Sequence, residues 1–365
     1  MDRVDCCVKD DIPAVARIHL KIFGNPSDEP SEGLKSYYKM VLSGNPWCDE
    51  ELPSLVYRSK DGNVEGFVGV ITRRMNFNGK SIRVAIPHRL MVAPDCSSPM
   101  AVLKIIKRFL AGPQDLSLGD GANDLGKKFM EGMGATTSKI YSMNWLCFLR
   151  PFAVMRNMIG KYNALKWIGA VSWPVCSLMD SIALNIPKSP IRPKQPDGCT
   201  AKEIDSQALL SCIARLSKRR PLYPEYDAEN IQWLWDFLKS NTQRGQLKGY
   251  EVRNAKDKQI GAYLYYLNSK KMMEVMLLLA REDSTEIVFS QLLSHAFDCN
   301  AVGVRGRMEP RFLQSMWDHH CFVKRGSWAV VHARDPEILN VINRGDAILS
   351  ALEGELWLRS PSDML

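Results

Sequence analysis

The two halves of the chain carry predicted helices and strands in the same order, and this repeat constrains the fold more than any single motif. Hydrophobic periodicity predicts two helices, three strands, a helix, a strand, a helix and a strand in each half. Between the halves, residues 186–198 hold four prolines and a glycine, a composition that excludes a helix or a central strand. The sequence therefore predicts two α/β modules with mixed sheets, residues 1–150 and 199–365. An apolar segment and a linker, residues 151–198, would join them.

The predicted elements follow from apolar spacing and turn residues. In the first half we expect helices at 11–22, 34–42, 97–110 and 125–134, and strands at 54–59, 64–77, 82–92, 115–120 and 139–146. In the second half we expect helices at 204–216, 228–238, 285–296 and 310–317, and strands at 249–254, 259–267, 271–280, 301–306 and 327–334.

Charge and cysteine usage exclude several classes of protein. Lys and Arg number 48 and Asp and Glu 40, so the net charge of +8 is mild and spread out. This favours anionic ligands or a membrane face and argues against nucleic acid. The ten cysteines include no C-x-x-C pair, and the charged N-terminus has no apolar core. We therefore expect reduced thiols, no signal peptide and a cytoplasmic location.

Residues 165–186 form a mostly apolar stretch of 22 residues, the length of a membrane-spanning helix. Pro174 interrupts the stretch, and Lys166, Asp180 and Asn185 are costly inside hydrocarbon, so a spanning helix is disfavoured. Interdomain packing, peripheral membrane contact and the wall of a pocket for an apolar substrate all stay open.

The element order resembles that of the GNAT superfamily of acyl-CoA-dependent N-acyltransferases, present twice in tandem. Three local matches in the first half support the resemblance: Val92-Ala93-Pro94 at the end of a strand, Gly121-Ala122-Asn123, and residues 129–134 (FMEGMG). In the second half, the strand at 271–280 and the helix after it carry the match.

The resemblance implies an acyl-CoA donor and an amine acceptor. In that family pantetheine lies between the splayed fourth and fifth strands, and the pyrophosphate lies at the N-terminus of the third helix. Residues expected to hold CoA are Met91, Val92, Ser97, Ser98, Met100 and Ala101. Neither glycine of the family's pyrophosphate loop is present there, and Pro99 removes one N–H donor. In the second half, Glu282, Asp283 and Glu286 stand at the corresponding place and would repel an anion, so the first module is the favoured donor site.

Four residues are candidates for catalysis. Glu274 occupies the place of a general-base glutamate of the family, with a structural alternative as an edge-strand side chain facing solvent. His88 lies near the end of the fourth strand, where a hydrogen-bonded structural role is the alternative. Asp120 and Asn123 lie at the tip of the fifth strand, at the rim of the expected cleft or in a plain turn. The family's tyrosine acid is absent, since Met130 and Trp317 stand at its two positions.

Other chemistries find little support. His319, His320 and Cys321, with His295 and Cys299, fit no metal-ligand spacing, so we expect no metal. No G-x-S-x-G, Walker loop or G-x-G-x-x-G occurs. The sequence therefore predicts an N-acyltransferase that uses acetyl-CoA, a longer acyl-CoA or an acyl carrier protein. A catalytically inactive tandem protein that binds a ligand or partner, and a transferase using aminoacyl-tRNA, remain the alternatives.

Overall fold

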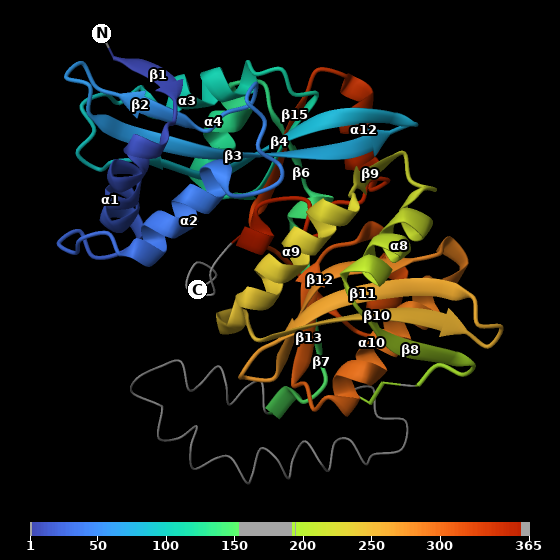
Figure 1. Cartoon of the computed structure of the whole chain (residues 1–365). Coiled ribbons are helices and arrows are strands. Elements are labelled where there is room, and N and C mark those ends of the chain that lie inside the picture. The colour runs from blue at the N-terminus through green and yellow to red at the C-terminus, as the bar shows by residue number, and fades with distance from the viewer. Residues whose placement is uncertain (1, 153–191, 194, 359–365) are drawn as a thin grey trace.

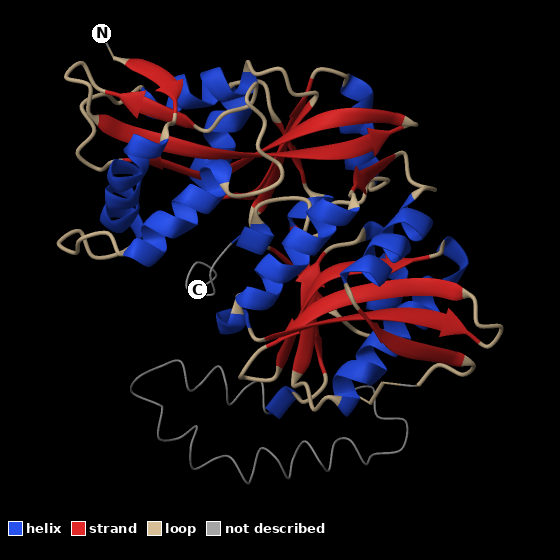
Figure 2. Ribbon diagram, viewed as in Figure 1, coloured by secondary structure: helices blue, strands red, loops and turns tan. Residues whose placement is uncertain are grey.

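The computed structural model describes residues 2–152, 192–193 and 195–358, so residues 165–186 and most of the predicted linker lie outside it. Two mixed β-sheets with helices packed on them make up the fold (Figures 1 and 2). The prediction of two mixed α/β modules is confirmed. In the described residues, no helix is long and apolar enough to cross a membrane.

The first sheet runs in the order β1-β2-β3-β4-β5-β15-β6, with β9 paired to β3. Its strands are β1 (Arg3–Cys6), β2 (Leu55–Arg58), β3 (Val64–Phe77), β4 (Lys80–Val92), β5 (Leu116–Ala122), β15 (Trp328–Ala333), β6 (Thr136–Ser138) and β9 (Leu222–Glu225). The second sheet runs β14-β7-β13-β12-β11-β10-β8. Its strands are β14 (Phe322–Arg325), β7 (Met143–Phe148), β13 (Gly303–Arg307), β12 (Met272–Ala280), β11 (Gln259–Leu267), β10 (Gln246–Asn254) and β8 (Cys199–Ile204).

Helices cover both faces of each sheet. In the first module α1 (Ile12–Phe23) and α2 (Glu32–Ser43) pack on one face, and α3 (Ala101–Leu110) and α4 (Asp124–Gly132) pack on the other, in separate apolar clusters. In the second module α8 (Ser206–Ser217) and α9 (Ala228–Ser240) oppose α10 (Thr285–Asp298), again in separate clusters. The remaining α-helices of the described residues are α11 (Leu313–Asp318) and α12 (Pro336–Arg344). Side-chain caps begin several of these helices, for example Ser31 on α2 and Asp227 on α9.

The two modules exchange a strand. The strand predicted at 139–146 corresponds to β7, which pairs with β13 and β14 in the second sheet. The strand predicted at 327–334 corresponds to β15, which pairs with β5 and β6 in the first sheet. The short strand β9 of the second half also joins the first sheet, beside β3. The division of the chain at residue 150 therefore does not coincide with the division between sheets.

The core is shared in the same way. Its largest apolar cluster combines the ends of β3 and β4 with α8, α9 and the C-terminal residues 347–358. Because burial of apolar surface is the main favourable term in folding, this cluster ties the two modules into one packed unit. The edge strands β1, β6, β8, β9 and β14, and the helix α12, are not among the predicted elements.

Candidate active site

A cleft opens between β4 and β5 in the first sheet. The two strands pair in parallel only at Val84↔Leu116 and Ala85↔Ser117, and they diverge beyond those pairs. The space between them is a cavity of about 320 Å³. Its walls come from both strands, from α3 and α4, and from a residue near the end of the described chain: Pro87, Arg89, Leu90, Gly119, Gly121, Ala122, Ile105, Ile106, Phe109, Gly126, Met130 and Glu355. Phe23, Val68, Asn123 and Val330 complete the lining.

A β-bulge shapes the β4 wall of the cleft. Gly69 pairs with His88 and Phe67 pairs with Met91, so Arg89 and Leu90 together lie opposite one residue of β3. Arg89 has φ of 55°, a left-handed conformation that is uncommon for a residue with a side chain. A bulge of this kind takes backbone groups out of the ladder and re-aims side chains. Here it bends β4 away from β5 at the level of the cavity.

His88 lies between a carboxylate of the cleft and a tyrosine of α2. Its side chain is fully buried, and Nδ1 lies 2.9 Å from Oε2 of Glu355. Nε2 contacts the hydroxyl of Tyr37. If Glu355 is ionised, Nδ1–H donates to it, and Nε2 then accepts from the Tyr37 hydroxyl. Glu355 lines the cleft and Tyr37 is partly exposed, so the three groups connect the cavity with the outer side of α2.

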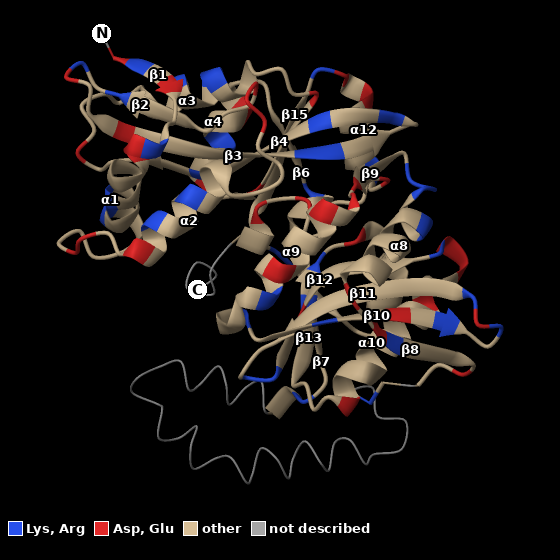
Figure 3. Cartoon of the chain, viewed as in Figure 1, with Lys and Arg blue, Asp and Glu red and all other residues tan. Residues whose placement is uncertain are grey.

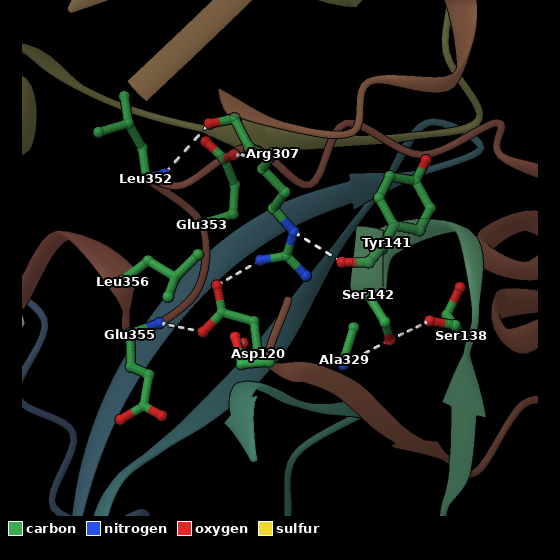
Figure 4. A network of polar contacts seen from close by, with 12 residues as sticks. Asp120, Ser138, Tyr141, Ser142, Arg307, Ala329, Leu352, Glu353, Glu355 and Leu356 are labelled. Atoms are coloured by element: carbon green, nitrogen blue, oxygen red, sulfur yellow. Dashed lines mark hydrogen bonds and ion pairs between the residues drawn. The ribbon is translucent and has the colours of Figure 1, made fainter. Parts of the chain in front are cut away.

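Asp120 lies next to this site, where its carboxylate accepts a hydrogen bond from the backbone of Glu355. Its Oδ1 accepts the Glu355 N–H at 2.7 Å, and its Oδ2 pairs with the guanidinium of Arg307 on β13 (Figure 4). Arg307 also donates through Nε to the carbonyl of Tyr141 at 3.0 Å. The side chains of Asp120 and Arg307 are 0% and 5% exposed. Asp120 is therefore a positioning residue that joins the two sheets and holds the segment carrying Glu355.

Asn123 lines the cavity and also caps α4. Its Oδ1 accepts the N–H of Gly126 at 2.8 Å, as expected for an N-cap. Tyr37 and Glu355 were not singled out by the sequence, because Glu355 is 267 residues from His88 and lies in no predicted element.

The expected pyrophosphate loop holds a carboxylate of the protein itself. Glu65 accepts the N–H of Ser97 at 3.0 Å and its hydroxyl at 2.8 Å, and Cys96 lies 3.3 Å away. Burial alone would raise the pKa of Glu65, but these hydrogen bonds hold its pKa below the ordinary value. The N–H groups in the first turn of α3, beginning at Ala101, remain the other anion-binding feature of this loop.

None of the six residues expected to hold CoA lines the cavity. Met91 and Ala101 are buried in separate apolar clusters, and Met100 is the exposed N-cap of α3. The remaining three lie at the end of β4 and in the loop that follows it: Val92, Ser97 and Ser98.

The corresponding gap in the second sheet is filled by the chain. β12 and β13 pair only from Met272↔Gly303 to Val275↔Gly306, so they diverge as β4 and β5 do. The N–H of Ala351 donates to the carbonyl of Met276 at 3.2 Å. Around it, apolar side chains of the C-terminal segment pack in the largest cluster: Leu349, Leu352, Trp357 and Leu358. The segment that fills this gap is the one that delivers Glu355 to the first cleft.

Glu274 lies between two arginines, away from the cleft. Oε1 accepts from Arg244 at 2.8 Å and Oε2 accepts from Arg305 at 3.0 Å. Burial would raise the pKa of Glu274, but Arg244 and Arg305 hold it below its ordinary value of 4.5. A carboxylate with a lowered pKa and both oxygens engaged is a poor proton acceptor. This arrangement favours a structural role for Glu274. It is not the solvent-facing edge-strand role named as the alternative, because β12 is a central strand and the side chain is only 17% exposed.

We expect Glu274→Gln to destabilise the protein without affecting transfer. The loss removes one partner of the buried Arg244 and should cost about 1–3 kcal/mol. Because the folded-state pKa of Glu274 is lowered, its stabilisation is present above about pH 4.5 and is lost as pH falls through the folded pKa. Melting temperatures from pH 7 to pH 3 should therefore fall less steeply with acidity in the variant. Parallel curves would contradict this role.

The histidines and cysteines considered for a metal do not gather. His295 contacts the hydroxyls of Tyr263 and Tyr265, whereas His319 contacts Glu286 and Ser290. Over the described residues, no group of three or more His, Cys, Asp or Glu side chains is arranged to hold a metal ion.

Comparison with known proteins places the fold. No protein-family model and no curated protein matches the chain. A probable N-acyltransferase of Enterococcus faecalis matches 91% of this chain and 73% of its own, with a TM-score of 0.60 and 12% identity. A GCN5-related N-acetyltransferase from Anabaena variabilis matches 92% of this chain and 74% of its own, with a TM-score of 0.59 and 10% identity. One from Kribbella flavida matches 92% and 72%, with a TM-score of 0.56 and 12% identity.

Structural similarity at such low sequence identity shows the fold alone, and here it extends over both modules. It agrees with the element order in each half and with the divergence of β4 from β5. The resemblance to GNAT proteins is thus confirmed at the level of the fold. The chain has the fold of the GCN5-related N-acetyltransferases, as two modules that exchange a strand.

Proposed function

We propose that the chain is an N-acyltransferase that passes an acyl group directly from CoA, or from an acyl carrier protein, to the amine of a small metabolite such as an amino sugar or amino acid. The observation that carries the proposal is the cavity between β4 and β5, where Glu355 is the one carboxylate among the described lining residues. The first module would bind the donor, and the filled gap in the second sheet supports that assignment.

Glu355 is the group that we assign as general base. An amine acceptor is largely protonated at neutral pH and must lose a proton before it attacks a thioester carbonyl. Glu355 faces the cavity and is held from behind by His88 Nδ1. With Glu355 ionised, Nδ1–H of His88 donates to it and Nε2 accepts from Tyr37, so the proton taken from the ammonium stays on Glu355 during the attack. His88 and Tyr37 are therefore positioning residues, because the buried imidazole cannot itself touch a substrate in the cavity.

The bulge supplies the second catalytic element of the proposal. Attack on the thioester places negative charge on its oxygen, and a preorganised backbone N–H is the usual stabiliser of such charge. We assign this role to the backbone of β4 at Arg89 and Leu90, which lines the cavity where the ladder is interrupted. At the family's position for a proton-donating tyrosine, Met130 lines the cleft. A thiol with a pKa near 8.5 can leave as thiolate without such an acid.

The lining of the cavity favours an acyl group longer than acetyl. Ile105, Ile106 and Phe109 of α3 give it an apolar wall, extended by Val68 and Met130. Each methylene buried against such a wall contributes about 0.8 kcal/mol, so a longer chain binds more tightly here.

Thermal stability in the presence of thioesters tests the donor. We expect acetyl-CoA and, more strongly, a long-chain acyl-CoA to raise the melting temperature, since a ligand at about 100 times its Kd adds about 2.7 kcal/mol. Gly119→Leu should abolish the shift, because a Cβ at Gly119 already lies 3.3 Å from Pro87 across the cleft and the longer side chain fills it.

Gly132→Leu is the matched control for this experiment. It adds the same side chain at the end of α4, where nothing lies within 4 Å of the added Cβ. An equal shift in both variants would place the thioester outside the cleft. No shift in the unmodified protein would remove CoA as the donor and leave an acyl carrier protein to be tried with the same variants.

A catalytically inactive ligand-binding protein is the second candidate. The carboxylate of Glu65 favours it, because Glu65 occupies donors that a pyrophosphate would use. Binding of an acyl-CoA at the cleft without transfer to any of a panel of amines would support this candidate over the transferase.

A further inference from the structure

A second pocket, of about 240 Å³, has five cations among its nine lining residues. Arg215 of α8, Arg219 beyond it, Lys258 at the start of β11, Arg281 after β12 and Arg311 of the 3-10 turn Pro310–Phe312 all line it. Glu282 is the one carboxylate of the lining, with Leu216, Gln259 and Ala280 making up the rest. In Figure 3, both basic and acidic segments lie between the end of α8 and the tips of β10 and β11. Four sequence segments thus bring five like charges together, although like charges repel.

Neighbouring carboxylates do not neutralise these cations. Arg215, Arg219, Lys258 and Arg311 form no ion pair with any described residue, and Arg281 pairs with Asp283 at 3.0 Å.

Apart from Glu282 in the lining and Asp283 on Arg281, the nearby acids pair with groups outside the pocket. Arg253 holds Glu251 and Asp257, and Arg220 holds Glu309. Glu286, expected from the sequence to repel an anion here, is turned to His319. A concave site with a net excess of cations focuses a positive potential that a bound anion would relieve.

A buried polar atom at the pocket also lacks a partner. Gln259 is 5% exposed and lines the pocket, and its Nε2 lies 2.8 Å from the sulfur of Cys212 and 3.2 Å from Glu251. Its Oε1 has no hydrogen-bond partner among the described residues. Buried polar atoms in native structures are normally satisfied, so an unpaired acceptor beside the cations points to a ligand that also carries a donor.

The pocket is separate from the acyl-transfer cleft. Its lining joins both faces of the second sheet, since Leu216 of α8 packs in the largest cluster and Ala280 packs in the cluster of α10. It shares no lining residue with the cavity between β4 and β5.

We propose that this pocket binds a phosphorylated small molecule, with its phosphate oxygens on Arg215, Arg219, Lys258 and Arg311 and a hydroxyl on Gln259. Guanidinium groups offer paired N–H donors that match the oxygens of a phosphate or a carboxylate, and the number of lining cations favours the more highly charged phosphate. A phosphate of two or more negative charges also offsets the repulsion among the lining cations. The site stands independently of acyl transfer.

Calorimetric titration of the full chain with inorganic diphosphate tests the proposal. The unmodified protein should bind diphosphate, and Arg215→Gln/Arg219→Gln should bind it about tenfold more weakly or worse, since each lost charged hydrogen bond is worth at least that factor. Lys60→Gln/Lys80→Gln is the matched control, because it removes the same charge from exposed lysines outside the pocket. Equal melting temperatures of the two double variants establish that both are folded.

Each outcome decides the assignment. Binding retained in the lysine pair and lost in the arginine pair supports the site, and so does binding that persists in Gly119→Leu. Equal affinity in both double variants, or loss in Gly119→Leu, would overturn it, because the anion would then bind the general field or the acyl cleft. Binding only to phosphatidic acid vesicles, and not to free diphosphate, would also overturn it in favour of a lipid surface.

Discussion

Glu355→Gln should lower the rate of acyl transfer by about 10²–10⁴-fold, the usual contribution of a positioned general base. Glutamine has the shape of glutamate and still accepts from His88 Nδ1, but it cannot take a proton from the acceptor amine. Binding of the acyl-CoA should change little, so the loss should appear in kcat. Single-turnover assays with saturating thioester and amine measure it. Transfer at the unmodified rate would exclude Glu355 as the base.

Glu353→Gln separates this effect from a disturbance of the C-terminal segment. Glu353 lies two residues away and accepts from Tyr226 and from the N–H of Ser350, outside the cleft. Burial raises the pKa of Glu353, so the neutral amide is a mild change. We expect near-normal transfer in this variant. Tyr37→Phe should fall between the two, because it removes the hydrogen bond that orients His88 and leaves Glu355 and His88 in contact.

The sequence predicted the helices and strands that hydrophobic periodicity defines. His88 shows that such a prediction gives the position of a residue but not its contacts. Apolar spacing located β4 and β5, and with them the places of His88, Asp120 and Asn123 at or near the cleft. Their partners were not predictable, because contacts between residues far apart leave no local pattern. Glu355 is 267 residues from His88, and Arg307 is 187 residues from Asp120.

Glu274 shows the same limit for a prediction of pKa. Its neighbours in sequence, Met273 and Val275, are apolar, and burial among apolar side chains raises the pKa of a carboxyl group. Arg244 and Arg305, from other elements, reverse the direction. The exchange of β7 and β15 was equally hidden, because both are short apolar strands that fit the same position in either sheet.

The C-terminal segment links the two modules in function as well as in packing. It fills the diverging strands of the second sheet through Ala351 and places Glu355 in the cleft of the first. If the second gap were open to pantetheine, this segment would have to leave, and Glu355 would leave His88 with it. The packing therefore favours one working cleft per chain. The ion pair of Asp120 with Arg307, and the hydrogen bond from the Glu355 N–H to Asp120, hold the segment in place.

Arg307→Met should lower the free energy of unfolding by about 3–5 kcal/mol, because it leaves the fully buried carboxylate of Asp120 without its cation. The substitution also removes the donor to the Tyr141 carbonyl, on the chain that enters the exchanged strand β7. Urea unfolding followed by tryptophan fluorescence measures the change. A loss below about 1 kcal/mol, the range of an exposed ion pair, would show that the pair does not hold the sheets together.

The double variant Asp120→Asn/Arg307→Met tests whether the two charges act as a pair. It should be more stable than Arg307→Met alone. Removing both charges leaves no unpaired ion, and an asparagine oxygen can still accept the N–H of Glu355. Transfer should follow the same order, since Glu355 keeps its place only while residue 120 holds its backbone. If the double variant were the least stable of the set, the two charges would act separately, and Arg307 would stabilise the protein through Tyr141 and not through Asp120.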